Sequence, residues 1–294
     1  MNLVKNKFKK KIKNNLIDTI DEVELKTDFH YKKTLDLWGL NNHKKNKKKY
    51  NADKTHIEKV ILEFPIKKKI ENFLEIGSGD GIDLRYIKKN FIIKNIYALE
   101  IGDNIYKLST EPYLRKVNFC RGDALNLIYK NNSFNFIYSY GVFHHTKNFI
   151  KCLYECKRVL KKNGQLIFYN YKKHNNIFKK FGIHLENILL NLLKNFSYNN
   201  VKIFCYLISP LVLLSFSYPA QLLKFIGNKN FYKKLPLWWG LTPNDIILDL
   251  TDRLYAPINI RMTKNEMKKI LIKVGFSSID IKEVRDGLFI SVNK

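Results

Sequence analysis

Residues 73–81 read Phe73-Leu74-Glu75-Ile76-Gly77-Ser78-Gly79-Asp80-Gly81, and this stretch decides the fold. A short apolar run leads into a turn with three alternating glycines, and residues 82–89 then carry apolar side chains at helical spacing. Glycine allows positive φ and a close approach of ligand to backbone, and amides at the start of the following helix favour anionic groups. The stretch therefore predicts a strand, a ligand-binding turn and a helix.

Two common nucleotide-binding turns do not match this stretch. A dinucleotide-binding turn needs G-x-G-x-x-G, but Ile82 stands at the position of the third glycine. A P-loop needs Gly-Lys-Ser/Thr, and the turn lacks it. An NAD enzyme is therefore a disfavoured alternative.

The sequence on either side continues the alternation of strands and helices. Strands are predicted over residues 95–99, 117–120, 134–139 and 165–169. A helix is predicted over about 147–160, ending in the basic residues and Gly164, with these side chains facing inward: Ile150, Leu153, Val159 and Leu160. This alternation predicts a doubly wound parallel sheet, whose ligands bind at the carboxyl ends of the strands.

The last part of the chain predicts a different pairing. Residues 278–284 and 288–292 are β-like and flank Arg285-Asp286-Gly287, a typical hairpin turn. A capping box at Thr263 and Glu266 begins a helix that Gly275 ends. The predicted fold class is α/β: a doubly wound, Rossmann-like sheet that ends in an antiparallel hairpin, with a helical insertion over the ligand end.

Four segments follow from these boundaries: a basic N-terminal helical and loop extension (1–70), a core (71–170), a helical insertion that caps the acceptor pocket (171–240), and a C-terminal helix and hairpin that complete the sheet (241–294). Within the first segment, these residues lie four apart and predict an amphipathic helix that packs on the domain: Val4, Phe8, Ile12 and Leu16. Residues 41–54 predict a solvated loop. Residues 203–223 carry no charge, but Pro210 and Pro219 argue against a membrane span, and membrane contact is the weaker alternative.

Several motifs resemble those of class I S-adenosylmethionine (SAM)-dependent methyltransferases, and among them the type 11 methyltransferases. Residues 75–81 resemble the acidic residue and G-x-G-x-G of that family. Residues 134–145 are similar to its F-D-x-V-x-x-x-x-V-L-H-H stretch, and residues 155–166 to its E-x-x-R-V-L-K-P-G-G-x-L stretch. Asn135 and Asn163 depart from the family pattern, at positions where no cofactor contact is expected.

The resemblance implies SAM as the cofactor and assigns it a set of contacts. Glu75 would help to hold the ammonium group, Glu100 both ribose hydroxyls, and Asp123 the adenine amine; a solvated strand end for Glu100 and a turn-forming role for Asp123 are the structural alternatives. The full set of expected cofactor-binding residues is Glu75, Gly77, Ser78, Gly79, Gly81, Glu100, Ile101, Asp123, Ala124 and Tyr140. No metal site is expected.

His144 and His145 follow the fourth predicted strand, beside the expected methyl donor. They are the candidate catalytic residues, since an oxygen or carbon nucleophile needs a base. Adjacent side chains diverge, so at most one faces the pocket. A loop-ordering or cofactor-packing role is the stronger alternative for both.

The formal net charge of +27 points first to nucleic acid or an anionic surface, but residues 71–170 carry only +6. Of the basic residues 46 are Lys and 7 are Arg, whereas proteins that read nucleic acid rely on Arg. Ser139-Tyr140-Gly141-Val142 also replaces the D/N-P-P-Y/F motif of adenine N-methyltransferases. The predicted function is in-line methyl transfer from SAM to a small-molecule or lipid-linked acceptor.

Three alternatives to this function stay open. They are an RNA or protein methyltransferase that uses the Lys-rich flanks, a non-catalytic SAM-fold binding module, and the NAD enzyme. No secretory signal is recognisable and the four cysteines lack disulfide or zinc spacing, so a cytoplasmic location is expected, with peripheral membrane contact as the lesser option.

Overall fold

The computed structural model describes residues 3–5, 12–13, 15–20, 28–38, 55–66, 69–227, 231–285 and 287–294. By its internal contacts the chain divides into two compact units. We call Met1–Lys173 with Ile258–Lys294 the sheet unit, and His174–Pro257 the helical unit. Each is described by itself.

The sheet unit is built on one mixed sheet. Its strands are β1 (Ile12–Lys13), β2 (Leu16–Asp18), β3 (Lys69–Ile76), β4 (Ile92–Glu100), β5 (Val117–Arg121), β6 (Phe134–Ser139), β7 (Leu160–Lys172), β8 (Arg261–Met262), β9 (Ser277–Glu283) and β10 (Gly287–Asn293). Their order is β1-β2-β5-β4-β3-β6-β7-β10-β9, with β8 beside β7. The pairs from β2 to β7 are parallel, and β10 is antiparallel to both β7 and β9. The predicted parallel sheet with a terminal hairpin is confirmed.

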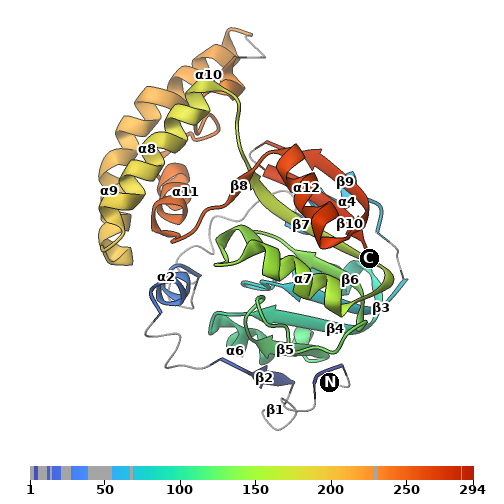
Figure 1. Ribbon diagram of the computed structural model, residues 1–294. Coiled ribbons are helices and arrows are strands. Elements are labelled where there is room, and N and C mark those ends of the chain that lie inside the picture. The colour runs from blue at the N-terminus through green and yellow to red at the C-terminus, as the bar shows by residue number, and fades with distance from the viewer. Residues whose placement is uncertain are drawn as a thin grey trace. The chain divides into compact units, whose positions relative to one another are not determined.

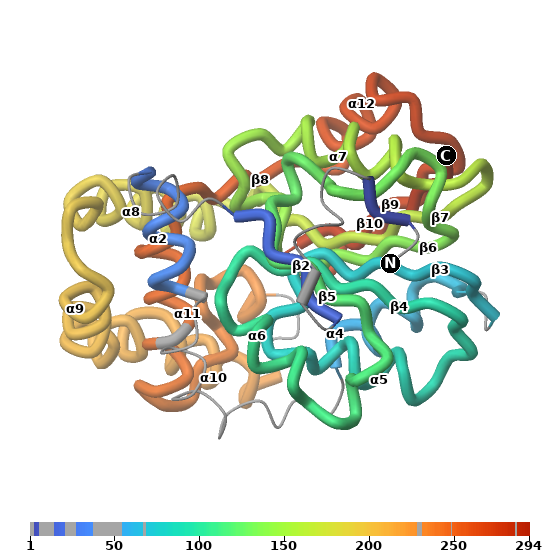
Figure 2. The backbone as a smooth tube through the Cα atoms, turned by 90° about the horizontal axis from the view of Figure 1, so that it is seen from below, coloured from blue at the N-terminus to red at the C-terminus, as the bar shows by residue number. Residues whose placement is uncertain are grey.

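Helices cover both faces of this sheet, as Figure 2 shows. Alternate strand residues face opposite sides, so Leu74 packs with α7 (Phe149–Val159) and α12 (Lys264–Val274), whereas Phe73 packs on the other side. The helices on that second side are α4 (His56–Glu63), α5 (Ile82–Asn90) and α6 (Asn104–Ser109). In Figure 1, α7 and α12 lie in front of the sheet.

The described N-terminal residues join the sheet unit and do not form the predicted helix. Val4 makes an antiparallel bridge to Tyr129, and Leu16 pairs in parallel with Phe119 of β5. Helix α2 (Phe29–Trp38) follows. The helix predicted over the first 20 residues is therefore wrong where the structure describes them, because strand pairing and burial override a four-residue spacing; Phe8 and residues 41–54 lie outside the described residues.

Two details around α7 differ from the prediction. Ile150 is exposed, because α7 turns Phe149, Cys152 and Leu153 to the core instead. The helix ends at Val159, and residues 161–164 form the first part of β7, where Asn163 takes a positive φ of 61°. Gly164 therefore does not end the helix. By contrast, the capping box at Thr263 and the stop at Gly275, with φ of 84°, are confirmed.

The helical unit is inserted in the chain between β7 and β8. It contains α8 (Ile177–Leu193), α9 (Tyr198–Val212), a π-helical turn (Leu213–Ser217), α10 (Tyr218–Phe225) and α11 (Pro243–Tyr255). Helix α11 packs against α8 and α9. Among the described residues one helix, Tyr198–Phe225, is long and apolar enough to cross a membrane by length and composition.

Candidate functional site

The glycine turn after β3 is held in a conformation that needs glycine. Gly77, Gly79 and Gly81 have φ of 81°, 51° and 77°. A Cβ at Gly77 would lie 2.1 Å from Val142 Cγ2, whereas one at Gly79 would meet nothing within 4 Å. The turn is therefore packed from behind at Gly77 and open at Gly79, where a ligand can approach the backbone.

Glu100 ends β4 directly beside this turn. Its carboxylate accepts hydrogen bonds from the amides of Gly79 (2.8 Å), Ile101 (2.8 Å) and Gly102 (3.0 Å). A carboxylate has about four lone-pair positions, so these bonds leave about one for a ligand. The Gly122 amide donates to the Glu100 carbonyl oxygen (2.9 Å), which ties the ends of β4 and β5 together. The structure thus brings the glycine turn, Glu100 with Ile101, and the end of β5 before Asp123 together at one edge of the sheet.

Glu75 is a buried carboxyl group one residue before the end of β3. It is 3% exposed, and its Oε2 has no hydrogen-bond partner among the residues that the structure describes. Burial raises the pKa of Glu75 well above its usual value, and the charges of Asp83, Glu100 and Asp80 raise it further. Such a carboxyl group gains most from a cationic ligand, because a positive charge would offset both causes.

Two more polar side chains at the turn have atoms without a partner in the described part of the chain. These atoms are Ser78 Oγ and Asn104 Oδ1, and both residues are buried. The Asn104 side-chain amide donates to the Gly79 carbonyl oxygen. Buried polar atoms are normally hydrogen-bonded, so their clustering here together with Glu75 is the mark expected of a site for a polar ligand.

Asp123 and Ala124 follow β5 and meet an N-terminal helix. Asp123 Oδ1 accepts from the Leu125 amide (2.8 Å), and Oδ2 accepts from the hydroxyl of Tyr31 in α2. Lys147 lies over the Tyr31 ring, 4.4 Å from its centre, and forms an ion pair with Asp28. Sequence analysis missed Tyr31, because it lies 92 residues before Asp123 and no motif marks it.

Tyr140, after β6, stands in a stack of rings. It lies between His56 of α4 (4.1 Å between ring centres) and Tyr169 of β7 (4.6 Å). His56 was also missed; the only signal near it is the Thr55–Glu58 capping box that begins α4. Asp83, another missed residue, accepts hydrogen bonds from the Ile57 amide (3.1 Å) and the Tyr138 hydroxyl (3.0 Å). It fixes the start of α4 beside the glycine turn.

The two histidines occupy the short 3-10 helix Phe143–His145 and differ in their surroundings. His144 is fully buried, and neither ring nitrogen has a partner within the described residues. His145 is part-buried, and its Nδ1–H donates to the Ile258 carbonyl oxygen (2.8 Å), which leaves the lone pair on Nε2. Burial lowers the pKa of both imidazoles, so both are uncharged at neutral pH.

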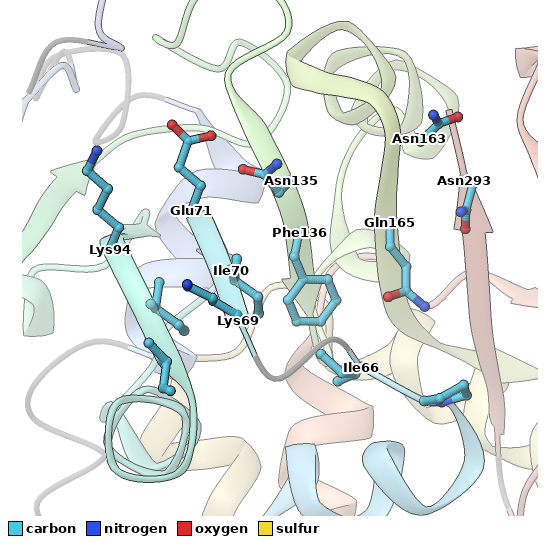
Figure 3. Close-up of a pocket in the computed structure, with 13 residues that line it drawn as sticks. Ile66, Lys69, Ile70, Glu71, Lys94, Asn135, Phe136, Asn163, Gln165 and Asn293 are labelled. Carbon is cyan, nitrogen blue, oxygen red and sulfur yellow. The ribbon is translucent and has the colours of Figure 1, made fainter.

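A pocket of about 840 Å³ lies at the opposite edge of the sheet, where β3, β4 and β6 begin. Figure 3 shows its lining, with Lys69 and Lys94 on neighbouring strands. It contains none of the predicted cofactor contacts but both departures from the family pattern, Asn135 and Asn163. Asn135 Oδ1 accepts from the Asn72 amide (3.1 Å), so that this departure has a structural role away from the site.

The comparisons with known proteins identify one domain of the chain. Residues 74–168 match a family model described as a methyltransferase domain. This segment is a methyltransferase domain. Its features, the glycine turn, Glu100 and Asp123, are those of class I SAM-dependent methyltransferases, and the cofactor of that class is SAM.

Two curated relatives match this methyltransferase more distantly. One is an uncharacterised protein of Methanocaldococcus jannaschii, 27% identical over 217 residues, which cover 72% of this chain and 81% of the relative. The other is the demethylmenaquinone methyltransferase of Thermotoga maritima, 28% identical over 113 residues, which cover 38% of this chain and 49% of that protein. The second match therefore spans about half of that relative.

Solved structures with a similar fold include two methyltransferases. A putative SAM-dependent methyltransferase of Methanococcus maripaludis is 17% identical, with a TM-score of 0.49, covering 94% of this chain and 96% of the other. The 1,6-didemethyltoxoflavin-N1-methyltransferase of Burkholderia thailandensis, solved with its substrate and S-adenosylhomocysteine, is 10% identical, with a TM-score of 0.49, covering 86% and 83%. Both scores lie below 0.5, so the domain is identified from the sequence match of residues 74–168 alone.

The residues of the methyltransferase domain fit SAM at the carboxyl edge of the sheet. The buried carboxyl group of Glu75 and the unpartnered Ser78 and Asn104 suit a ligand that carries an ammonium group and hydroxyls. The open face of Gly79 leaves room for that ligand beside the backbone. The cluster of unsatisfied polar atoms is thus explained by a ligand of SAM's chemistry.

Proposed function

We propose that this methyltransferase moves a methyl group from SAM to a small-molecule or lipid-linked acceptor, and that the ten predicted contact residues form its cofactor site. The main support for the cofactor site is the environment of Glu75. Its carboxyl group is buried beside the glycine turn, and one of its oxygens has no hydrogen-bond partner among the described residues. An uncompensated buried carboxyl group costs stability, and a cationic ligand is the compensation that its position allows.

Each end of SAM has a proposed partner in the chain. Glu75 holds the ammonium group, the Gly77–Gly81 turn accommodates the methionyl end, and Asp123 accepts from the adenine amine. The ring of Tyr140 is stacked between His56 and Tyr169, so it would meet the cofactor with its edge rather than with a face. When bound, SAM supplies an electrophilic methyl group on a sulfonium, and the enzyme's main task is to align the acceptor with it.

Glu100 is proposed to bind the ribose hydroxyls, but its carboxylate is already engaged. Three backbone amides use about three of its four lone-pair positions. One hydroxyl can take the remaining position on Oε2, and a second requires one of the amides to release its bond. The Gly79 amide belongs to the open part of the turn and is our candidate for this release.

Of the two histidines, His145 is the proposed acceptor-side residue. His144 has no exposed surface, whereas His145 is part-buried and is oriented by the Ile258 carbonyl oxygen. Its lowered pKa keeps the imidazole uncharged at neutral pH, so that Nε2 can accept a hydrogen bond or a proton from the acceptor. A His145→Ala variant with unchanged turnover and acceptor KM would remove this residue from the mechanism.

Calorimetric titration with SAM tests the cofactor site. We expect binding by the unaltered protein, and for Glu100→Ala a loss of at least about tenfold in affinity, since charge-assisted hydrogen bonds contribute about 1.5–3 kcal/mol. Glu283→Ala is the matched control, because Glu283 is an exposed carboxylate on β9 that pairs with Lys172. Failure to bind SAM, or a thermal shift with NAD in its place, would overturn the proposal.

The acceptor is tested separately with methyl-labelled SAM and fractionated cell extract. Label in a small molecule or a lipid supports the proposed acceptor class. Label in RNA or protein contradicts it while leaving the cofactor site intact. Binding of SAM without transfer to any fraction would favour a non-catalytic module.

A further inference from the structure

The long helix from α9 to α10 turns its large apolar side chains to the outside. Side chains at a helical spacing of three or four residues are well exposed, several by more than 60%. They are Ile203 (59%), Leu207 (72%), Leu211 (66%), Leu214 (64%), Leu222 (61%) and Phe225 (88%). Such a stripe is the pattern of an amphipathic helix whose apolar face is unpartnered in the described structure.

The buried side of the same helix carries mostly small residues, with Val201 and Leu213 as the larger ones. Cys205, Ser209, Ser217 and Ala220 are all fully buried. Cys205 lies against Thr251 of α11, and Ser217 Oγ donates to the Leu237 carbonyl oxygen (2.8 Å). Small and weakly polar residues inside with large apolar residues outside is the reverse of a water-facing helix, and it is the arrangement of helices that face lipid.

Helix α8 repeats this reversed polarity. Its exposed stripe consists of Ile177, Phe181, Leu185, Ile188 and Leu192. Its inner side holds Gly182, where a Cβ would lie 3.0 Å from Pro236 Cγ, and the buried Glu186, whose carboxylate pairs with Arg253 of α11 (3.7 Å). Both helices that flank α11 therefore expose a stripe of large apolar residues on their outer surface.

The charges around these stripes have one sign. Residues 174–242 hold eight lysines and a single acidic residue, Glu186, which is buried and paired. Lys202 and Lys224 bracket the uncharged residues 203–223. Lysines at the border of an apolar face complement the negative headgroups of an anionic lipid surface, each contributing about 1 kcal/mol near it.

We propose that the outer faces of α8 and α9–α10 form a membrane-docking surface that embeds in one leaflet of an anionic bilayer. The helix does not cross the bilayer, because its inner side packs on α11, which carries Asp249, Asp252 and Arg253, and a span would bring these charges into the hydrocarbon. This inference is independent of methyl transfer and goes beyond the proposed function.

A second copy of the chain is the competing occupant of this surface. Self-association through the stripes would bring two sets of lysines together with no acidic partner from the same segment. An anionic bilayer provides an apolar interior for the stripes and negative headgroups for the lysines, whereas a second copy would cover only the stripes. The charge complementarity therefore favours the lipid surface.

Vesicle flotation of the full chain tests the proposal. We expect binding to vesicles of phosphatidylcholine with 30% phosphatidylglycerol, weakened by salt, and little binding to phosphatidylcholine alone. Leu207→Ser with Leu211→Ser should lower the partition coefficient at least about tenfold. Ile272→Ser is the control, because Ile272 is also an exposed apolar residue (58%) but lies on α12 of the sheet unit.

Further measurements separate the outcomes. SAM binding by each variant shows whether its sheet unit is folded. A variant that loses SAM binding is misfolded, and its vesicle binding is then replaced by that of the lysine variant described next. Lys202→Glu with Lys224→Glu should reduce binding to the anionic vesicles and leave SAM binding unchanged. Absence of flotation, an equal loss of vesicle binding in the Ile272 variant, or a dimer that the Leu207 and Leu211 changes dissociate would each overturn docking in one leaflet.

Discussion

The sheet unit and the helical unit use their apolar residues in opposite ways. In the sheet unit the apolar side chains of the central strands are buried, and Phe168 of β7 has no exposed surface. In the helical unit Phe225 is 88% exposed, while Ser209 and Ser217 are fully buried on the inner side of the same long helix. The sheet unit therefore keeps its core apolar, whereas the helical unit carries apolar stripes on its outer surface.

Each unit also has residues that depart from the usual pattern of buried apolar and exposed polar side chains, and these residues are arranged differently in the two units. Within the sheet unit, Glu75 and His144 are polar and buried without full hydrogen bonding among the described residues, and both lie at the carboxyl edge of the strands. Within the helical unit the exceptions form continuous stripes along α8 and α9–α10. Single buried polar residues at the edge of a sheet indicate a site for a small ligand, whereas a continuous exposed apolar stripe indicates a docking surface.

The largest effect is expected from the core of the sheet unit. Phe168→Ala should lower the free energy of unfolding by about 3–5 kcal/mol, because it removes a fully buried aromatic ring and leaves a cavity. Phe225→Ala should change it by less than about 0.5 kcal/mol, because that ring is already in solvent. Urea unfolding followed by circular dichroism measures both. Equal losses would mean that the two units do not differ in this way.

The glycine turn should show the next effect. Gly77→Ala should destabilise the sheet unit by roughly 2–4 kcal/mol and abolish SAM binding, because the added Cβ clashes with Val142 and φ is positive. Gly79→Ala should cost only about 1–2 kcal/mol from its φ, since nothing lies within 4 Å of the Cβ. Thermal unfolding with and without SAM measures both. A Gly77 variant as stable as the Gly79 variant would show that the Val142 side chain moves to make room for the added Cβ.

Glu75 should make SAM affinity depend on pH. Below its raised pKa the free protein carries a proton on Glu75, and this proton must leave when the carboxylate pairs with an ammonium group. Affinity should therefore rise with pH, by up to about tenfold per pH unit, between the usual carboxyl range and the raised pKa. Titrations in buffers of different ionisation enthalpy measure the released proton.

The Glu75→Gln variant is the control for this dependence. It should bind SAM more weakly, release no proton and show no rise of affinity over the same pH range. Its stability should also fall less as pH rises, because ionisation of the unfolded Glu75 no longer favours unfolding. A variant with the same pH profile as the unaltered protein would place the titrating group elsewhere.

Only a small change in stability is expected at His144. His144→Phe should alter the free energy of unfolding by less than about 1 kcal/mol in either direction, because an apolar ring replaces one whose nitrogens have no partner in the described structure. Turnover with the identified acceptor is the second measurement. A large loss of turnover at unchanged stability would make His144, rather than His145, the residue that acts on the acceptor.

Much of the sheet unit could be predicted because its signals are local. The strand predicted over residues 134–139 is β6 as observed, and the turns at Gly77–Gly81 and Thr263 have sequence signatures that depend on a few neighbouring residues. Their convergence at the carboxyl edge follows from parallel pairing, which places Glu75 and Glu100 on adjacent strands. Strand periodicity and turn chemistry were sufficient there.

The remaining features depend on contacts between distant parts of the chain. The pairing of Leu16 with Phe119, and the contact of Tyr31 with Asp123, join residues about a hundred positions apart without any repeating pattern. Ile150 was placed inward because a helical period alone does not say which face meets the core. Likewise, the carboxylate of Glu100 is engaged by amides that only the folded turn brings within reach.

The position of β10 constrains the order in which this protein can fold as it is synthesised. β9 precedes β10 in the chain, yet β10 lies between β9 and β7. β9 therefore cannot join the sheet until the later strand has left the ribosome, and the outer edge of β7 stays open for hydrogen bonding throughout that interval. The helical unit lies in the chain between β7 and β8, so its apolar stripes leave the ribosome before β9 and β10 can complete the sheet.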